Sequence, residues 1–274
     1  MKIALDCIPC LFKQALTTIR KATENEDLHK KMLLLVGEKL PELVDLPTPT
    51  HAGRIIHNLP KKIANCHDPY RKEKQKHTKI ALKWYHKLKE FVKNSPDPLL
   101  AAIKVSIVGN VIDFGRGEEV DVEKGIEKGL ESDFRVIHYD EFKEALTDTD
   151  EILYLADNAG ETVFDRILIE ELHKPVLYAV KGESVLNDAT FEDAKLAGID
   201  KVAKIIVSGS DAPGTLLEYC TDEFCEIFKN AKLIISKGQG NYEALSDITK
   251  DNLFFLFKVK CTPVAKYLGL EVED

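Results

Sequence analysis

The chain has 274 residues, of which 44% are hydrophobic and 31% are charged, a composition typical of a globular protein of one or two domains. This composition excludes a disordered or collagen-like chain. No apolar run approaches the roughly 18 residues that a membrane span needs, so we expect no membrane partner.

The net charge of −8 is distributed unevenly along the chain. Residues 61–94 carry eleven lysines and arginines against three acidic residues, so this stretch is basic while the remainder is strongly acidic. A solvated helix face is the first interpretation of the stretch, and attraction of an anionic substrate is the second. Because few aromatic residues interleave with the basic ones and the whole chain is acidic, we expect no nucleic-acid partner.

Helical periodicity dominates the first hundred residues. Apolar residues recur at helical spacing in four segments, which are residues 7–20, 27–40, 70–93 and 99–112. Asp6 is the expected N-cap of the first helix, and the proline-punctuated residues 46–50 predict a loop that caps a helix starting near His51. We expect no strand before about residue 135.

From about residue 150 the pattern changes to short apolar runs that alternate with helical stretches. The runs have the continuous apolar character of strands buried on both faces of a parallel sheet, and they lie at residues 152–155, 176–180, 205–207, 233–235 and 253–257. Helical patterns lie between them, at residues 161–172, 189–197, 214–229 and 241–247. The alternation predicts a three-layer α/β/α sandwich with a mostly parallel sheet. We divide the chain into a mainly helical N-terminal region, residues 1–105, and an α/β domain, residues 106–274.

Polar residues follow each predicted strand, at the edge of the sheet where open parallel sheets bind ligands. Asp157 and Asn158 follow the first strand, and Asp188 follows the second. Carboxylate and amide oxygens suit Mg²⁺ or Mn²⁺ better than a metal that prefers thiolate or imidazole ligands. The alternative is helix capping, because all three residues stand just before predicted helices.

Glycine-rich turns and lysines at the later strand ends are candidate phosphate contacts. The backbone N–H groups at Ser208 and Gly209 could cradle an anion, although the chain has no Walker A loop and no dinucleotide fingerprint. Lys237 and Lys260 stand at the ends of the fourth and fifth strands, where a lysine serves phosphate as a point charge. The alternative for each is an ordinary surface lysine.

The N-terminal segment carries two thiols, Cys7 and Cys10, on the first turn of a predicted helix, where the helix dipole lowers a thiol pKa. A redox pair, half of a metal site and two structural thiols are all open interpretations, and Cys261 joins the pair only if the C-terminal helix folds back. The segment has no apolar stretch of about 7–15 residues before a cleavage site, so we expect a cytoplasmic location.

In combination, these residues resemble the metal-dependent damage-control phosphatases, and the CxxC pattern is similar to that of a subfamily found in archaea and bacteria. The motifs that carry the resemblance are Asp157-Asn158-Ala159-Gly160, Asn187-Asp188-Ala189-Thr190, Ser208-Gly209-Ser210-Asp211, Ser236-Lys237-Gly238 and Lys258-Val259-Lys260-Cys261.

The resemblance implies a Rossmann-like domain and a divalent ion (Mg, Mn, Co or Ni) held by Asp157, Asn158 and Asp188. It also implies hydrolysis of small phosphorylated metabolites, such as sugar phosphates or damaged phosphometabolites, and it places Lys260 on phosphate. The substrate role of Lys237 rests on the strand-end argument alone.

Two mechanisms fit this resemblance. Metal-activated water attacks phosphorus in the one we favour, and Asp157 attacks directly in the other. The alternative functions are an S-adenosylmethionine-dependent carboxyl methyltransferase and a non-catalytic metabolite-binding or redox-sensing module that uses Cys7 and Cys10.

Overall fold

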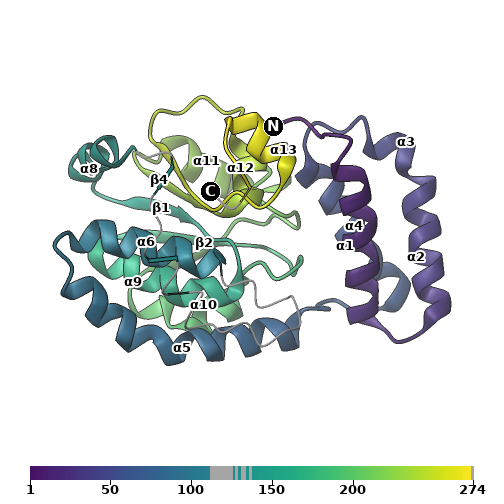
Figure 1. Ribbon diagram of the computed structural model, residues 1–274, viewed down its shortest axis with the longest axis horizontal. Helices are drawn as coiled ribbons and strands as arrows, with labels where there is room; N and C mark the ends of the chain where they lie inside the picture. The colour runs from purple at the N-terminus through teal and green to yellow at the C-terminus, as the bar shows by residue number, and fades with distance from the viewer. Residues whose placement is uncertain (112–125, 127–128, 131–133, 136–137, 273–274) are drawn as a thin grey trace.

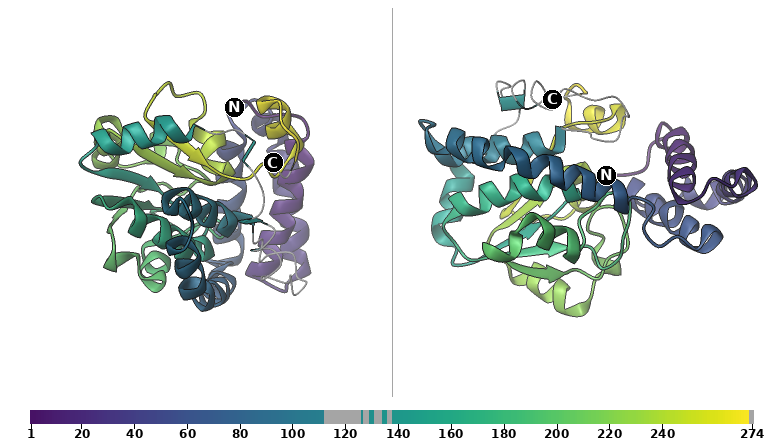
Figure 2. Two further views of the ribbon diagram at one scale, coloured as in Figure 1. Left: turned by 60° about the vertical axis from the view of Figure 1, so that its left-hand side comes forward. Right: turned by 90° about the horizontal axis from the view of Figure 1, so that it is seen from below.

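The computed structural model describes residues 1–111, 126, 129–130, 134–135 and 138–272. Helices α1 (Cys7–Ala22), α2 (Glu26–Glu38), α3 (Leu40–Leu43) and α4 (Pro49–Ala64) gather at one end of the molecule (Figures 1 and 2). They bury a core of their own, which includes Leu11, Ile19, Met32, Val36 and Ile56. The expected helices are confirmed here, except that the predicted segment 27–40 is divided into α2 and α3.

The ends of these helices follow the expected capping chemistry at one site and depart from it at another. Thr48 caps α4, because its Oγ1 accepts a hydrogen bond from the backbone N–H of His51, and Pro49 occupies the first turn. The helix therefore begins two residues before His51. Asp6 stands at the N-cap position of α1, but its side chain makes no capping hydrogen bond.

A chain of buried hydrogen bonds links α1 to α4 through His57. Tyr70 Oη lies 3.0 Å from Thr18 Oγ1, which lies 3.3 Å from His57 Nδ1, while His57 Nε2 lies 2.9 Å from Gln14 Oε1. A neutral imidazole satisfies every partner if Nε2 carries the proton, donating it to Gln14 and accepting from Thr18 at Nδ1. Burial lowers the pKa of His57 to about 3.

The remaining helices cover a five-stranded sheet. Its strands are β1 (Ile152–Leu155), β2 (Val176–Val180), β3 (Lys204–Val207), β4 (Ile234–Lys237) and β5 (Leu253–Leu256). All neighbouring pairs are parallel and the order is β3-β2-β1-β4-β5, with Leu155 beside Ala179 on one side and Ser236 on the other. Successive strands are added on one side of β1 up to β3 and on its other side from β4. The carboxyl ends of β1 and β4 are therefore the switch point of the sheet.

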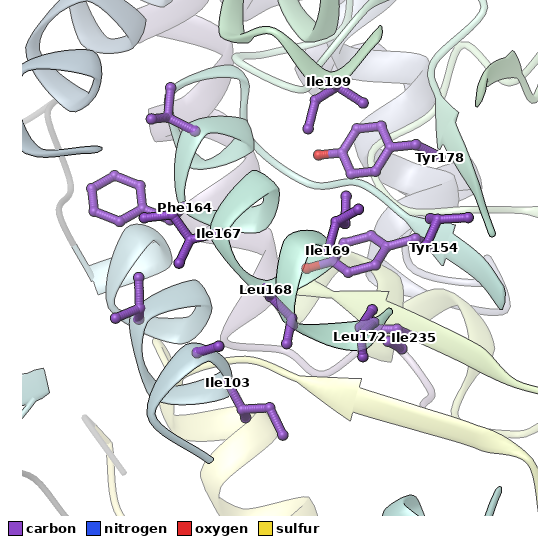
Figure 3. Packing of buried hydrophobic residues seen from close by; sticks show 14 of the residues in the cluster. Ile103, Tyr154, Phe164, Ile167, Leu168, Ile169, Leu172, Tyr178, Ile199 and Ile235 are labelled. Atoms are coloured by element: carbon purple, nitrogen blue, oxygen red, sulfur yellow. The ribbon is translucent and has the colours of Figure 1, made fainter. Parts of the chain in front are cut away.

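Two layers of helices enclose the sheet. On one face, Tyr154, Tyr178 and Ile235 share a core with α5 (Arg71–Lys93), α6 (Pro98–Val111), α9 (Thr162–Leu172) and α10 (Phe191–Ala197), part of which Figure 3 shows. On the other face, Leu153 and Ile234 pack against residues of α11 (Asp222–Asn230) and α12 (Gly238–Leu245). The fold is thus the expected Rossmann-like three-layer α/β/α sandwich.

Two further helices complete the described chain. The helix α8 (Tyr139–Asp148), for which the sequence reading has no counterpart, places Phe142 against Phe254 of β5. The helix α13 (Thr262–Leu268) packs near the N-terminal residue Met1. The domain boundary at residue 105 stays a prediction, but α5 and α6 share their core with the sheet rather than with α1–α4.

The predicted helix over residues 214–229 is wrong in its first half. A 3-10 turn occupies Leu217–Tyr219, and α11 begins only at Asp222, capped by the Thr221 hydroxyl. Gly214 has a φ of +73° and lies against the backbone of Gly240, so the chain turns sharply there instead of starting a helix. No helix within the described residues is long and apolar enough to cross a membrane.

The buried neutral His57 predicts a loss of stability in acid. Below pH 6.5, the ordinary pKa of histidine, His57 binds a proton in the unfolded chain but stays neutral in the folded protein. The free energy of unfolding therefore falls as the pH drops toward 3. Between pH 7 and pH 4 the protonation of His57 in the unfolded chain lowers the free energy of unfolding by about 3 kcal/mol. Urea unfolding at both pH values should show a smaller pH-dependent loss for His57→Gln than for the wild type. The exposed His86→Gln serves as control, and equal losses in all three proteins would contradict the assignment.

Candidate active site

The loops that follow β1 and β2 are joined edge to edge by backbone hydrogen bonds. The N–H of Ala189 donates to Asp157 O and the N–H of Ala159 donates to Asn187 O, each over 2.8 Å, and Asn158 forms an antiparallel bridge with Asp188. The structure therefore brings together Asp157, Asn158 and Asp188, as expected of polar residues at adjacent strand ends.

Helix capping does not account for these side chains. The N-cap of α10 is Thr190, which forms a reciprocal capping box with Asp193, so Asp188 lies outside the cap. Asn158 stands before the 3-10 turn η1 (Ala159–Glu161), and its side chain makes no capping hydrogen bond. It donates instead from Nδ2 to Asp157 Oδ2 over 2.7 Å.

Asp157 sits tightly against the backbone at the switch point. A Cβ atom added to Gly238, which follows β4, would lie 2.0 Å from Asp157 Oδ2, and Gly238 has a φ of +79°. Glycine is therefore required here for both space and backbone conformation. Burial and the neighbouring Glu161 and Asp188 carboxylates raise the pKa of Asp157 well above the ordinary range, against the opposing effects of Lys260 and Lys181.

Asp188 has a carboxylate oxygen whose hydrogen-bonding capacity is unused among the described residues. Its Oδ2 atom is buried and accepts no hydrogen bond, although the ammonium of Lys181 forms an ion pair with it at 3.4 Å. Lys181 directs a hydrogen bond to the carbonyl oxygen of Gly214. Burial raises the pKa of Asp188, and Lys181 opposes this effect. A buried acceptor of this kind is costly unless a ligand completes it.

Lys237 is not placed as predicted. Its side chain is fully buried below the strand ends, where its ammonium donates to Glu161, to Asp165 Oδ1 at 2.6 Å and to Ser106 O at 3.1 Å. These three bonds use all three ammonium hydrogens, so none is left for a phosphate. Burial lowers the pKa of a lysine, but the two carboxylates outweigh it and raise the pKa of Lys237.

Ser208 and Gly209 lie at the end of β3, beside the loop that follows β2. The N–H of Gly182 donates to Ser210 O over 2.9 Å, and a Cβ on Gly182 would lie 2.6 Å from the carbonyl carbon of Gly209. Ser208 is buried, and its Oγ accepts from the N–H of Ser210 over 3.3 Å. The close backbone approach explains Gly182, whereas Gly209 is required by its φ of +84° and by the nearby Thr221 side chain. A phosphate contact at this turn stays a prediction.

Lys260 is exposed and lies close enough to Asp157 for its charge to lower that carboxyl pKa. Its backbone N–H donates to Gln239 Oε1 over 2.8 Å, which ties the segment after β5 to the start of α12. The end of β5 thus brings the Lys260 charge near Asp157, while a contact between Lys260 and phosphate stays a prediction.

The C-terminal helix folds back toward the N-terminal thiols, because Cys261 lies near enough to Cys7 to raise the pKa of that thiol. Cys261 is the N-cap residue of α13, and its Sγ accepts from Gln239 Nε2 over 3.3 Å, while Cys10 Sγ accepts from Gln14 Nε2 over 3.2 Å. Burial raises the pKa of Cys7 and of Cys261, in contrast to the lowered thiol pKa that the helix position of Cys7 predicted. A redox role for Cys7 and Cys10 stays a prediction.

No three His, Cys, Asp or Glu side chains among the described residues converge in a way that could hold a metal ion. The candidate donors at the switch point are the carboxylates of Asp157 and Asp188 and the amide of Asn158. Because asparagine is not one of the four residue types, these donors do not form such a group of three.

Sequence reasoning missed three buried residues of the site, which are Glu161, Asp165 and Lys181. Lys181 follows β2 directly and is one of the polar strand-end residues, but nothing in the sequence assigns it a role. Glu161 accepts from Asn158 Nδ2 over 3.0 Å, and Asp165 accepts from two tyrosines on the sheet. Neither residue follows a strand directly, and no spacing in the sequence marks them.

The basic stretch contributes one buried lysine near this edge of the sheet. Lys74 on α5 forms ion pairs with Asp193 at 2.8 Å and with Asp68 at 2.9 Å. Other lysines of α5, including Lys72 and Lys79, are exposed and face a groove on the outer side of that helix. The solvated-face interpretation thus holds for these exposed lysines, and Lys74 is the exception.

Comparisons with known proteins show which family the chain resembles along its length. The sequence matches the damage-control phosphatase ARMT1-like domain over residues 3–274. It is 35% identical to the damage-control phosphatase PH1575 of Pyrococcus horikoshii, over 98% of this chain and 94% of that protein. It is also 33% identical to a damage-control phosphatase of Archaeoglobus fulgidus, over 100% of this chain and 98% of that one.

Two further comparisons cover the whole chain. An uncharacterized protein of Methanocaldococcus jannaschii, MJ0202, is 38% identical over 100% of this chain and 94% of its own length. The crystal structure of the Pyrococcus horikoshii protein, described as a DUF89 family protein, superposes with a TM-score of 0.90 at 34% identity, covering 100% of this chain and 97% of the other. With both sequence and fold in agreement along its length, this chain belongs to the damage-control phosphatase ARMT1-like family.

Proposed function

We propose that this protein is a divalent-metal-dependent phosphatase that hydrolyses small phosphomonoesters, with the cation held by Asp157, Asn158 and Asp188. Membership of the damage-control phosphatase family supports the phosphatase activity. The observation that carries the metal site is the buried Asp188 Oδ2, which accepts no hydrogen bond among the described residues and forms an ion pair with Lys181 at 3.4 Å. Asn158 lies opposite Asp188 across a backbone bridge.

The charge around these residues also suits a divalent cation. Four buried carboxylates (Asp157, Glu161, Asp165 and Asp188) lie near the buried ammonium groups of Lys181 and Lys237. Such an excess of buried negative charge is unfavourable unless protons or a cation compensate it. Oxygen donors from carboxylates and an amide favour Mg²⁺ or Mn²⁺, and Co²⁺ or Ni²⁺ are also compatible with them.

A bound cation would supply positive charge that polarises a phosphoryl oxygen and acidifies a water molecule. The exposed Lys260 would pair with the remaining phosphate charge from the side of β5. We favour attack by water. A bond forms between the water oxygen and phosphorus as the bond between phosphorus and the ester oxygen breaks, and the water proton that is released protonates the departing alcohol. Asp157 is the poorer nucleophile, because its carboxylate is committed to Asn158 and packed on Gly238. A phosphorylated Asp157, trapped during turnover, would reverse this preference.

The position of helices α1–α4 favours the proposal that the substrate is small, because α4 is fastened to loops at the same edge of the sheet. Arg54 on α4 donates to Asp211 in the loop after β3 and stacks on Tyr219, with its guanidinium carbon 3.8 Å from the ring centre. Lys61, also on α4, forms an ion pair with Glu183 in the loop after β2 at 2.9 Å. These contacts limit the space beyond the strand ends.

The first prediction of this proposal concerns metal dependence. Metal-stripped protein should not hydrolyse p-nitrophenyl phosphate, and Mg²⁺, Mn²⁺, Co²⁺ or Ni²⁺ should restore turnover. Asp157→Ala and Asp188→Ala should each lower turnover by about 100-fold or more while the protein remains folded, because each removes a ligand oxygen.

The thermal unfolding of both variants is the control for this experiment. Unfolded protein in both cases would indicate that the carboxylates are structural. Turnover that is independent of metal would contradict the metal site. If no metal gives turnover, S-adenosylmethionine binding and titration of Cys7 and Cys10 test the alternative functions.

The second prediction concerns Lys260. The change Lys260→Ala should raise KM for phosphomonoesters by roughly 5- to 10-fold with a smaller effect on kcat, since it removes one charge that pairs with phosphate. Lys266→Ala, which removes an exposed lysine from nearby α13, is the matched control and should leave KM unchanged. Equal kinetics for Lys260→Ala and the wild type would exclude Lys260 from the site.

A further inference from the structure

We propose that Glu161 is a positioning residue that orients the side-chain amide of Asn158, so that its oxygen rather than its nitrogen faces the cation. The inference rests on the proposed function, because it assigns a role toward the same metal site. Glu161 does not touch the reacting atoms in this proposal, and it acts through Asn158 alone.

The first step of the argument is the orientation of the amide. Asn158 Nδ2 donates to Asp157 Oδ2 over 2.7 Å and to Glu161 Oε2 over 3.0 Å. A primary amide has two N–H donors. Glu161, which also accepts from Lys237, acts only as an acceptor, and so does an Asp157 carboxylate that binds a cation, so the nitrogen faces these two groups. Both N–H hydrogens are then used, and the amide oxygen Oδ1 points away from Asp157 and Glu161. In that orientation Oδ1 can serve as a hard oxygen ligand.

The second step is that Glu161 cannot easily reverse its own role. Its side chain is completely buried, and Lys237 donates to Oε1 while Asn158 donates to Oε2. The ammonium has no acceptor, so it demands an oxygen at that end of the Glu161 carboxyl. Glu161 therefore stays a double acceptor, with one oxygen for Lys237 and one for Asn158.

The third step is the rigidity of the support beneath Glu161. Asp165, on α9, holds Lys237 and accepts hydrogen bonds from Tyr154 on β1 and Tyr178 on β2, both over 2.7 Å. Ser106 on α6 donates to the same carboxylate over 2.9 Å. Lys237, which bonds to Glu161, is thus held by a network that draws on three strands and two helices. Such a support is the arrangement expected beneath groups that orient a metal ligand.

A purely structural ion cluster is the competing explanation. Buried ion pairs are weak evidence for stability, because their desolvation cost offsets their mutual attraction. A structural cluster also gives no reason for one member to reach Asn158, whereas the positioning role requires that contact.

The test is binding of Mn²⁺ alone to the metal-stripped full chain, measured by calorimetry, with the variant Glu161→Gln. In this variant the glutamine Oε1 must face Lys237, which leaves Nε2 facing Asn158 Nδ2. Two donors then oppose each other, whereas a reversed Asn158 amide would set its oxygen against Asp157 Oδ2. Neither orientation satisfies both neighbours, so the amide oxygen is no longer held toward the cation. We expect Mn²⁺ affinity to fall roughly 10- to 100-fold while metal-free thermal unfolding shifts by only a few degrees.

A matched control separates this effect from a general loss of a buried acid. Glu170→Gln changes another glutamate, which is partly buried on α9. Glu170 accepts hydrogen bonds from Tyr85 and Lys89 and lies away from Asn158. Its Mn²⁺ affinity should equal that of the wild type. Wild-type affinity in Glu161→Gln would overturn the positioning role.

A second variant separates orientation from net charge. Lys237→Met removes a positive charge, so electrostatics alone would increase Mn²⁺ affinity, whereas loss of the anchor of Glu161 should decrease it by about the same factor as Glu161→Gln. Increased affinity in folded Lys237→Met would overturn the inference, and decreased affinity would support it. A wild-type protein that binds no Mn²⁺ would instead refute the proposed metal site itself, so the two failures are distinguishable.

Discussion

The buried ammonium of Lys237 is the interaction on which the rest of the candidate site depends. It lies in the core at the end of β4 and bonds to Glu161, to Asp165 and to a carbonyl oxygen of α6. Burying any one of these charges without its partners would be costly, so the members of the set stabilise one another. That requirement couples the packing of α6 and α9 to the geometry of the loop that carries Asp157 and Asn158.

The strand order makes this coupling useful. Because β1 and β4 are neighbours in a parallel sheet, Asp157 and Gly238 meet at the point where the order of the strands reverses. The backbone bonds between the loops after β1 and β2 then add Asp188 from the other side. Arg54 and Lys61 fasten helix α4 to the loops after β3 and β2 at the same edge.

Much of the fold could be predicted from the sequence, because continuous apolar runs and helical periodicity are local signals. The strands and most helices lie where those signals place them. The failure over residues 214–229 has a local cause as well, since the positive φ of Gly214 and the cap at Thr221 divide the segment. The site was predicted in part: the strand-end rule located Asp157, Asn158 and Asp188, but it assigned the wrong surroundings to Lys237.

The difference lies in what a strand-end position determines. The sequence by itself determined which residues reach the carboxyl edge, because parallel strands all end on that side. Only the tertiary structure decided where each side chain points and what it meets. Lys237 lies two residues after Ile235, so it faces the same α6 and α9 layer and finds Glu161 and Asp165 there. Those partners come from distant segments, and hydrogen bonding among buried charges, which no local pattern encodes, assigns their roles.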